Sequence, residues 1–332
     1  MRQSFRRIAV LGLAAATLLA AVFSAFPSRS TADSLSETVL SMFPKQVGEF
    51  AYADMKSARQ YSWFPALRDQ LLPSRFREFE KFLASAGIDP NTQVDQVAWG
   101  GINIAKTGGE EIVGVALGSF DPGAAEQHFK QQKLPVLDVN GHHLYAFGSG
   151  VAPGDILFTF IDPNTAAFGH RSALEKLIAV RSGQAQSLVD NNKIYPLINA
   201  TNGTGIIWAV LDQNYTHLAV NQLLPQANQF PQAEQIMSRL QAMTISVDAD
   251  SGVDAKFQAV CSSPSDANLL SAALQAGIMY RRYQEGQQNQ ALSAALDQVR
   301  VSPAGDRLNV DIPLSQDQLV SLIRSRAFAI QM

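Results

Sequence analysis

The sequence predicts an α+β protein built from two repeats of ferredoxin-like type. We expect antiparallel or mixed sheets with helices on one face, after an N-terminal hydrophobic helix. Three observations predict this fold class. Residues 8–26 form an uncharged apolar run. Two strand patterns, Phe50–Asp54 and Trp208–Asp212, are apolar runs closed by an aspartate. Helical and hairpin patterns then follow each strand in the same order, which is typical of a two-layer α+β sandwich.

The N-terminal segment has the pattern of an export signal. Arg2, Arg6 and Arg7 precede the run Ile8–Phe26, whose 19 residues carry no charge. A basic start followed by an apolar run is typical of a secretory signal, because the positive end stays inside while the run enters the bilayer. The sequence therefore predicts an exported bacterial-type envelope protein.

Two fates of this segment stay open. Ser30-Thr31-Ala32 supplies small residues of the kind that a signal peptidase requires, which favours cleavage after Ala32. The apolar run is longer than the roughly 7–15 residues of a usual signal core and close to the roughly 20 needed to cross a bilayer. Residues 1–32 are thus expected to be a signal peptide or a membrane anchor. The body would be periplasmic or extracellular, or held at the inner membrane through residues 8–26.

Charge and cysteine content disfavour several classes of function. Residues 33–332 carry 22 basic and 29 acidic residues, a net charge of −7. Nucleic acid requires clustered Lys and Arg, so we expect no nucleic-acid partner. The lone cysteine, Cys261, excludes an intramolecular disulfide. It lies in an alternating apolar stretch and is expected to be a core residue.

The first unit is expected to span residues 33–195. After the opening strand, Phe76, Phe79, Phe82 and Leu83 recur at helical spacing. The further expected elements are a hairpin of Val94–Gly100 with Ile112–Phe120, a helix starting at Asp121-Pro122, and a hairpin Leu137–Phe147 turning at Asn140-Gly141. An extension adds a hairpin of Ile156–Ile161 with Ala166–His170, then a helix capped by Ser172 and Glu175 that ends near Gly183.

The second unit is expected to span residues 196–332, after a connection at Gln184–Gly205. Ile236, Met237 and Leu240 have helical spacing. The further expected elements are a hairpin of Met243–Asp248 with Val253–Cys261, a helix from Ser263-Pro264 with Asp266 in a capping box, a hairpin Val299–Ile312, and a last helix opened by Ser315 with Gln318.

Asp54 and Asp212 hold matched places at the ends of the two opening strands. They would form a paired-carboxylate site if the two units faced each other. Aspartates at strand ends more often cap the next turn. Both interpretations stay open from the sequence alone.

Two clusters that contain aromatic side chains are candidate binding sites. Tyr61, Trp63 and Phe64 cluster before a proline and would form either a core cover between helices or an exposed recognition patch. Arg281 and Arg282 stand between two tyrosines on a long helix. The second group would form either a solvated helix face or a contact with a partner.

No pattern indicates a metal or a cofactor. His142 and His143 are neighbours on an expected strand, where adjacent side chains point to opposite faces and do not chelate one ion together. The sequence contains no Gly-x-Ser-x-Gly and no phosphate-cradling loop with lysine. We expect no catalytic residue, metal or cofactor of a familiar kind.

The leader, the opening strand Phe50-Ala51-Tyr52-Ala53-Asp54 and the tandem units resemble a group of uncharacterised exported bacterial proteins. The resemblance covers most of residues 45–325 and implies no catalytic residues. The predicted function is a non-catalytic binding or scaffolding module with an envelope protein as partner. The alternative is an envelope hydrolase whose dispersed carboxylates, Asp54, Asp95, Asp138 and Asp212, meet in one pocket.

Overall fold

The computed structural model describes residues 34–72, 74–104, 109–152, 154–223, 237–249, 252–285 and 290–324. The chain divides into two compact units: the first holds residues 34–60 and 72–196, and the second holds residues 61–71 and those from 197 on. The expected leader, residues 1–32, lies outside the described residues. Within the described ranges, no helix is both long and apolar enough to cross a membrane.

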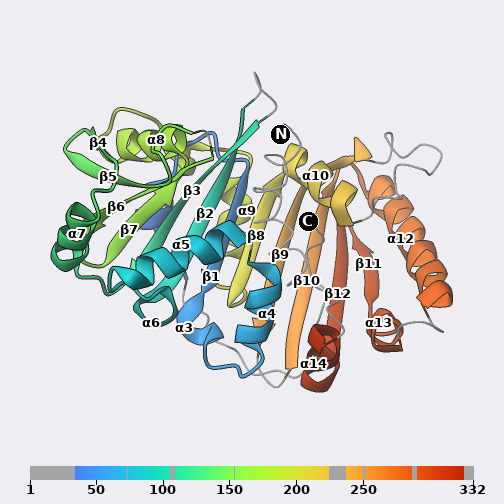
Figure 1. Cartoon of the computed structure of the whole chain (residues 1–332). Coiled ribbons are helices and arrows are strands. Elements are labelled where there is room, and N and C mark those ends of the chain that lie inside the picture. The colour runs from blue at the N-terminus through green and yellow to red at the C-terminus, as the bar shows by residue number, and fades with distance from the viewer. Residues whose placement is uncertain are drawn as a thin grey trace. The chain divides into compact units, whose positions relative to one another are not determined.

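The first unit carries seven antiparallel strands within the described residues (Figure 1). Its strands are β1 (Glu49–Asp54), β2 (Val94–Ile104), β3 (Gly109–Gly118), β4 (Val136–Val139), β5 (His142–Phe147), β6 (Ile156–Asp162) and β7 (Thr165–Gly169). Its helices are α2 (Glu37–Leu40), α3 (Met55–Ala58), α5 (Ser74–Ser85), α6 (Pro90–Gln93), α7 (Pro122–Gln131), α8 (Arg171–Arg181) and the 3-10 turn η1 (Leu188–Asp190). Helix α9 (Tyr195–Thr201) follows and leads into the second unit.

The α+β prediction is confirmed, but the strand order of the first unit differs from the ferredoxin-like order. The order is β1-β2-β3-β7-β6-β5-β4, and each neighbouring pair is antiparallel. In a split βαβ unit the two strands joined by a helix are parallel, with a third strand between them. Here Asp54 pairs with Gln96, so the helical connection between β1 and β2 starts and ends at the same edge. It therefore makes no crossover.

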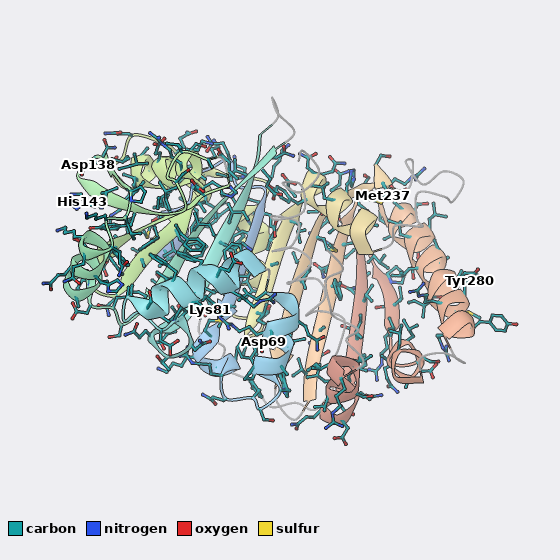
Figure 2. All side chains as sticks on the ribbon, in the orientation of Figure 1. Asp69, Lys81, Asp138, His143, Met237 and Tyr280 are labelled. Carbon is teal, nitrogen blue, oxygen red and sulfur yellow. The ribbon has the colours of Figure 1, made fainter. Side chains whose placement is uncertain are left out.

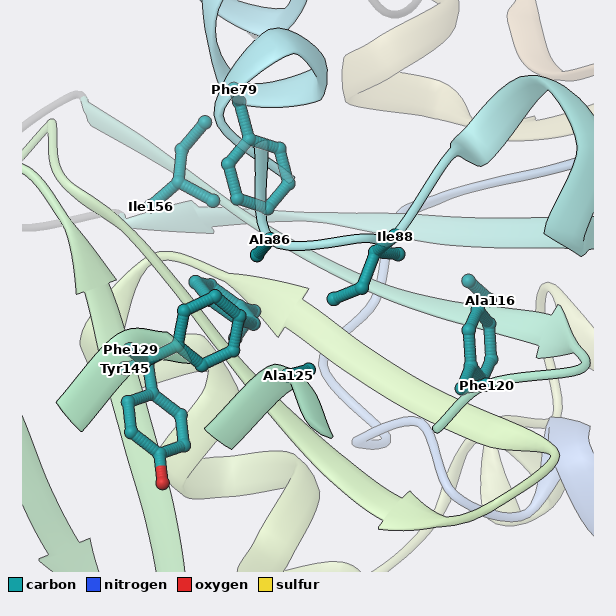
Figure 3. Close-up of a cluster of buried hydrophobic side chains, with 10 residues drawn as sticks. Phe79, Ala86, Ile88, Ala116, Phe120, Ala125, Phe129, Tyr145 and Ile156 are labelled. Carbon is teal, nitrogen blue, oxygen red and sulfur yellow. The ribbon is translucent and has the colours of Figure 1, made fainter. Parts of the chain in front are cut away.

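A phenylalanine-rich cluster fills one face of this sheet (Figure 3). Phe79 of α5 and Phe129 of α7 pack against Phe158 of β6, with ring centroids 5.6 and 5.1 Å from the Phe158 ring. Such tilted and edge-on aromatic pairs are favourable beyond the area they bury. The helical spacing of the phenylalanines in α5 therefore marks its core face, as predicted.

Helices cover both faces of the first unit's sheet, so the expectation of helices on one face is wrong there. Ile156 and Phe158 belong to the phenylalanine-rich cluster, whereas Leu157 between them points to the opposite face and is also buried. On that opposite face α8 packs against β3, β6 and β7. The run Ile156–Phe158 is apolar without alternation, which is typical of strands buried on both faces.

The second unit carries five antiparallel strands within the described residues. Its strands are β8 (Ile207–Asp212), β9 (Leu240–Ala249), β10 (Gly252–Cys261), β11 (Arg300–Ala304) and β12 (Arg307–Ser315), in the order β8-β9-β10-β12-β11. Its helices are α4 (Phe64–Leu71), α10 (Gln213–Leu223), α12 (Pro264–Glu285), α13 (Gln290–Leu296) and α14 (Gln316–Arg324).

Helix α12 packs through one face against β10, β11 and β12, and Figure 1 shows it beside β11. Ala267 and Leu270 of that face lie in a cluster with Cys261 and Leu308. Cys261 is 3% exposed, so the prediction of a core cysteine is confirmed. Burial raises the pKa of its thiol, and the nearby carboxylates of Asp266 and Asp306 raise it further.

Local signals for turns and caps are mostly confirmed. Asp121 accepts a hydrogen bond from the Ala124 N–H at 3.0 Å and so caps α7. Asn140 and Gly141 have φ angles of 49° and 80°, as a type I′ turn requires. At α14, Ser315 and Gln318 bond each other's backbone N–H groups in a capping box.

Two local predictions are wrong. Helix α8 begins at Arg171, and Ser172 does not cap it because its hydroxyl donates to Glu111 of β3. Leu240 opens strand β9 rather than belonging to a helix, while Ile236 lies outside the described residues. The helix that follows β8 is α10 instead. In both cases the deciding contact is with a strand distant in sequence, which local spacing does not reveal.

The cap of α12 predicts an acid-sensitive stability. Hydrogen bonds from Ser263 and Arg239 lower the pKa of Asp266 below its usual value. A carboxylate whose pKa is lowered by folding stabilises the fold above its unfolded pKa, and this contribution is lost as pH falls through the lowered value. Asp266→Asn should therefore reduce the drop in urea midpoint between about pH 7 and about pH 3.

Asp317 provides the control, because Asp317→Asn removes an exposed acid in the first turn of another helix, α14. The drop in urea midpoint should be nearly unchanged in that variant. An equal drop in the unmodified chain and in Asp266→Asn would contradict the assignment.

Candidate functional site

Asp54, at the end of β1, is 2% exposed and caps the helix that follows. Its Oδ1 accepts from the Ser57 N–H at 2.8 Å, and its Oδ2 accepts from the Ser57 hydroxyl at 2.7 Å. The first of these bonds gives an acceptor to a backbone N–H that has none within the first turn of α3. The arrangement is that of a structural cap.

Asp212, at the end of β8, plays the same part in the second unit. Its Oδ1 accepts from the Tyr215 N–H at 3.0 Å, at the third residue of α10. Each of the two aspartates proposed as a carboxylate pair thus holds the start of the next helix within its own unit. The capping alternative fits the geometry of both.

The other candidate carboxylates of the first unit are held in ion pairs. Asp95 Oδ1 lies 3.3 Å from Arg59 Nη2, and Asp138 Oδ1 lies 3.2 Å from His143 Nε2. Asp138 and His143 are labelled together on the β4–β5 hairpin in Figure 2. Strands β1 and β4 are the two ends of the seven-stranded order, and six strand spacings of roughly 4.8 Å separate them by about 29 Å. The sheet therefore does not bring Asp54 and Asp138 into one pocket.

Tyr61, Trp63 and Phe64 belong to the second unit. The rings of Tyr61 and Trp63 stack with centroids 5.3 Å apart, and Phe64 meets Trp63 edge-on. Trp63 and Phe64 are buried, and the hydroxyl of the half-buried Tyr61 donates to the Ala249 carbonyl of β9. The cluster thus has the placement of a core cover, not of an exposed patch.

A small apolar cleft opens in the first unit near α5. It encloses about 10 Å³ of free space, roughly the room that one water molecule needs. It is lined by Phe76, Ile112, Gly154, Ile156, Phe168, Gly169 and His170. Its only ionisable side chain is His170, whose Nδ1 accepts from the Ile112 N–H at 3.2 Å. A neutral histidine that accepts at Nδ1 carries its proton on Nε2. The cleft therefore holds no more than about one water molecule, and its described lining contains no acid–base pair.

Within the described ranges, no group of three or more His, Cys, Asp or Glu side chains is arranged to hold a metal ion. His142 is half-buried and His143 is exposed on β5. Burial lowers the pKa of His142, and the charge of Arg181 lowers it further.

Helix α12 carries an exposed apolar surface. From the sequence, only one end of this helix was singled out, at Arg281 and Arg282. This surface, the outer face of α12, consists of Leu269, Ala272, Ala273, Ala276, Met279, Tyr280 and Tyr283. Leu269 is 48% exposed, Met279 68%, Tyr280 59% and Tyr283 86%. Figure 2 shows Tyr280 on the side of α12 that faces away from the sheet. The recurrence of apolar residues at steps of three and four is the signal that would have revealed this face.

No protein-family model matches the chain, and no curated protein matches it. Two solved structures resemble it: crystal forms I and IV of the Treponema protein TP0453. Each is 12% identical with a TM-score of 0.47. The similarities cover 90% and 89% of this chain, and 99% and 97% of those chains.

The capping geometry predicts a stability role for both aspartates. Asp54→Ala and Asp212→Ala should each lower the free energy of unfolding by about 1 kcal/mol, because each leaves a helix N–H without its acceptor. Asp54→Asn and Asp212→Asn keep an acceptor oxygen and should lose only a few tenths of that, about 0.3 kcal/mol. Urea unfolding of the four variants measures the difference. A loss in the Asn variants equal to that in the Ala variants would contradict a capping role.

Proposed function

We propose that this chain is an exported envelope protein that binds or scaffolds a partner protein and does not act as an enzyme. The observation that carries the proposal is the outer face of α12. Large apolar side chains in contiguous exposed patches mark interaction sites more often than isolated ones do. Three of the four large side chains, Met279, Tyr280 and Tyr283, lie within two turns of helix. Aromatic residues and Met are enriched at protein interfaces.

The surroundings of the candidate carboxylates support a non-catalytic role. Asp54 and Asp212 cap helices, and Asp95 and Asp138 form ion pairs with Arg59 and His143. A hydrolase would require two such groups to converge on one substrate. The cleft beside His170 offers a single ionisable group.

The proposed location is the cell envelope. It is supported by the basic start and the apolar run at residues 8–26. Residues 33–332 would then be periplasmic or extracellular, or held at the inner membrane if the run is not removed. The acidic balance of these residues argues for a protein partner over nucleic acid.

We further propose that the two units are tandem repeats, with a strand order different from the ferredoxin-like one. In each unit the opening strand ends in a capping aspartate and pairs antiparallel with the next strand, Asp54 with Gln96 and Asp212 with Ala242. In each, the third strand then pairs with the second strand of a later hairpin, β3 with β7 and β10 with β12. A helix follows that hairpin, α8 or α14. On this basis β4–β5 is the additional hairpin of the first unit.

Export predicts a defined mature mass. The chain expressed in a bacterial host should be found in the envelope fraction, with an intact mass matching residues 33–332. Ala32→Arg should block this processing, because the peptidase site requires a small residue. Intact-mass measurement of both forms decides the fate of the leader. A full-length mass in the membrane fraction would identify an anchor, and a full-length soluble cytoplasmic product would overturn export.

The binding role predicts a site-specific cross-link. A photoreactive phenylalanine analogue at Tyr283 should form a covalent protein adduct on irradiation of intact cells, because this side chain lies on the outer face of α12. The same analogue at Gln184, an exposed polar position of the first unit, is the control. Denaturing gels detect the adducts. Equal labelling at the two positions, or none at Tyr283, would contradict a binding surface on α12.

A further inference from the structure

Helix α12 is apolar on two opposite sides. Its inner side, with Ala267, Leu270 and Leu274, packs into the core of the second unit. The outer face begins at Leu269 and ends at Tyr283, a length of about 21 Å at the α-helical rise. A helix on the surface of a soluble protein normally shows polar residues on its solvent side, and a helix that is apolar around its circumference is normally buried. The outer face therefore fits a helix that is covered by a partner.

The sizes of the side chains on either side of Ala276 are complementary, with two alanines before it and Met279 and Tyr280 after it. If two copies of α12 crossed antiparallel at this residue, position 272 of one would lie opposite position 280 of the other, and 273 opposite 279. The small Ala272 and Ala273 would then receive the large Tyr280 and Met279. Leu269 would meet Tyr283 at the ends, and Ala276 would meet its own copy. On each side of the crossing point two large side chains would thus pack against two small ones, as interdigitated helix packing requires.

Gly277 adds an independent observation next to the proposed crossing point. A Cβ added to Gly277 would meet no atom within 4 Å, so nothing in the described part of this chain requires a glycine there. Glycine in a helix interior is unfavourable relative to alanine because it loses more backbone entropy on folding. Its use is to allow close approach of another backbone, which the antiparallel crossing would bring to this position.

The charges on α12 favour the antiparallel orientation. In a parallel pair, Arg281 and Arg282, which lie off the outer face, would stand at the same level as the same residues of the second copy and gather like charge at one end of the pair. In the antiparallel pair, position 281 lies opposite position 271, so the two arginine pairs are about 15 Å apart along the helices. That separation exceeds the Debye length of roughly 8 Å at physiological salt. An antiparallel pair of identical helices is also what a two-fold dimer produces.

A bilayer surface fits the outer face less well than a second copy. Membrane-bound helices of this type combine an apolar face with several unpaired basic residues. Arg282 is already paired with Asp297 of the segment after α13, and residues 33–332 carry a net charge of −7, which anionic lipid repels. The three alanines at the centre of the stripe would add little buried area in lipid, whereas between two helices they allow close contact.

We propose that two copies of this chain form a two-fold dimer through an antiparallel pair of α12 helices crossing at Ala276. The proposal rests on the binding role assigned to α12 and specifies the partner as a second copy. One helix pair gives an interface at the small end of the range, below about 1,200 Å² in total. The dimer is therefore expected to be in a micromolar equilibrium with the monomer, not permanent.

Sedimentation of the protein as isolated from cells should show a concentration-dependent monomer–dimer equilibrium. Ala276→Arg should weaken it about tenfold or more, because it places two like charges at the two-fold axis. Ala84→Arg, at an exposed alanine on α5, should leave the equilibrium unchanged. Gly277→Ala should weaken association and, in the same molecule, raise the thermal midpoint of unfolding. A role confined to the monomer fold would not produce these opposite effects.

Disulfide mapping tests the orientation, and the buried Cys261 does not interfere. Ala276→Cys should form a disulfide dimer under mild oxidation, while Ala84→Cys should not. A mixture of Ala272→Cys and Tyr280→Cys chains should give the mixed 272–280 disulfide in preference to 272–272 or 280–280.

Three results would overturn the dimer. The protein could sediment as a monomer at all concentrations, the Ala276→Cys chain could oxidise no faster than Ala84→Cys, or the homodisulfides could exceed the mixed one. A monomer that binds phosphatidylglycerol vesicles through Tyr283 would replace the second copy by a lipid surface. A photo-cross-link at Tyr283 to a different protein, together with monomeric sedimentation, would overturn the dimer and leave the binding role intact. Loss of the Tyr283 cross-link altogether would overturn the binding role itself.

Discussion

Water has almost no access to the opening strand of either unit, since all six residues of β1 and the first five of β8 are buried. Backbone N–H and C=O groups in such strands must find partners inside the protein. The antiparallel neighbours β2 and β9 supply those partners along each strand. At the end of each strand a helix starts, and its first N–H groups have no intrahelical acceptor. Asp54 and Asp212 each supply an acceptor there. Each aspartate therefore completes the hydrogen bonding at the end of its buried strand, which explains their matched positions without a catalytic role.

Features set by neighbouring residues were predictable from the sequence, and features set by distant strands were not. Asp121 before Pro122, the turn at Asn140-Gly141 and the capping box of Ser315 all depend on residues within three or four positions. Ser172 matched the same capping pattern, but its hydroxyl donates a hydrogen bond to Glu111 of β3, which is distant in sequence. Helices on both faces of the first unit's sheet were indicated by the unbroken apolar run Ile156–Phe158, because alternation would have indicated one solvated face. Trp63 and Phe64 lie in the second unit, which no local pattern could indicate.

The candidate binding site taken from the sequence, the aromatic cluster at Tyr61, differs from the one that the structure offers, the outer face of α12, for the same reason. From the sequence, the aromatic cluster at Tyr61 fitted either a core cover or an exposed patch, because its burial depends on the distant strand that ends at Ala249. The outer face of α12, in contrast, is encoded within one helix and needs only helical geometry to be seen. Its alanines make it hard to recognise in the sequence, because alanine is also the best helix former and its presence does not by itself indicate an interface. The large exposed residues at either end, Leu269 and Tyr283, together with Gly277 between them, are the reason for proposing an interface there.

The single cysteine supports a non-covalent role for that surface. In the oxidising compartment where we propose that the chain works, an exposed thiol would form disulfides with other proteins. Cys261 lies beneath α12, 3% exposed, and burial raises its thiol pKa, so little of the reactive thiolate forms. The helix thus shields the thiol on its inner side and presents an apolar stripe on its outer side. Any partner recruited by α12 would consequently be held without a disulfide from this chain, and a non-covalent contact of that size can form and separate repeatedly.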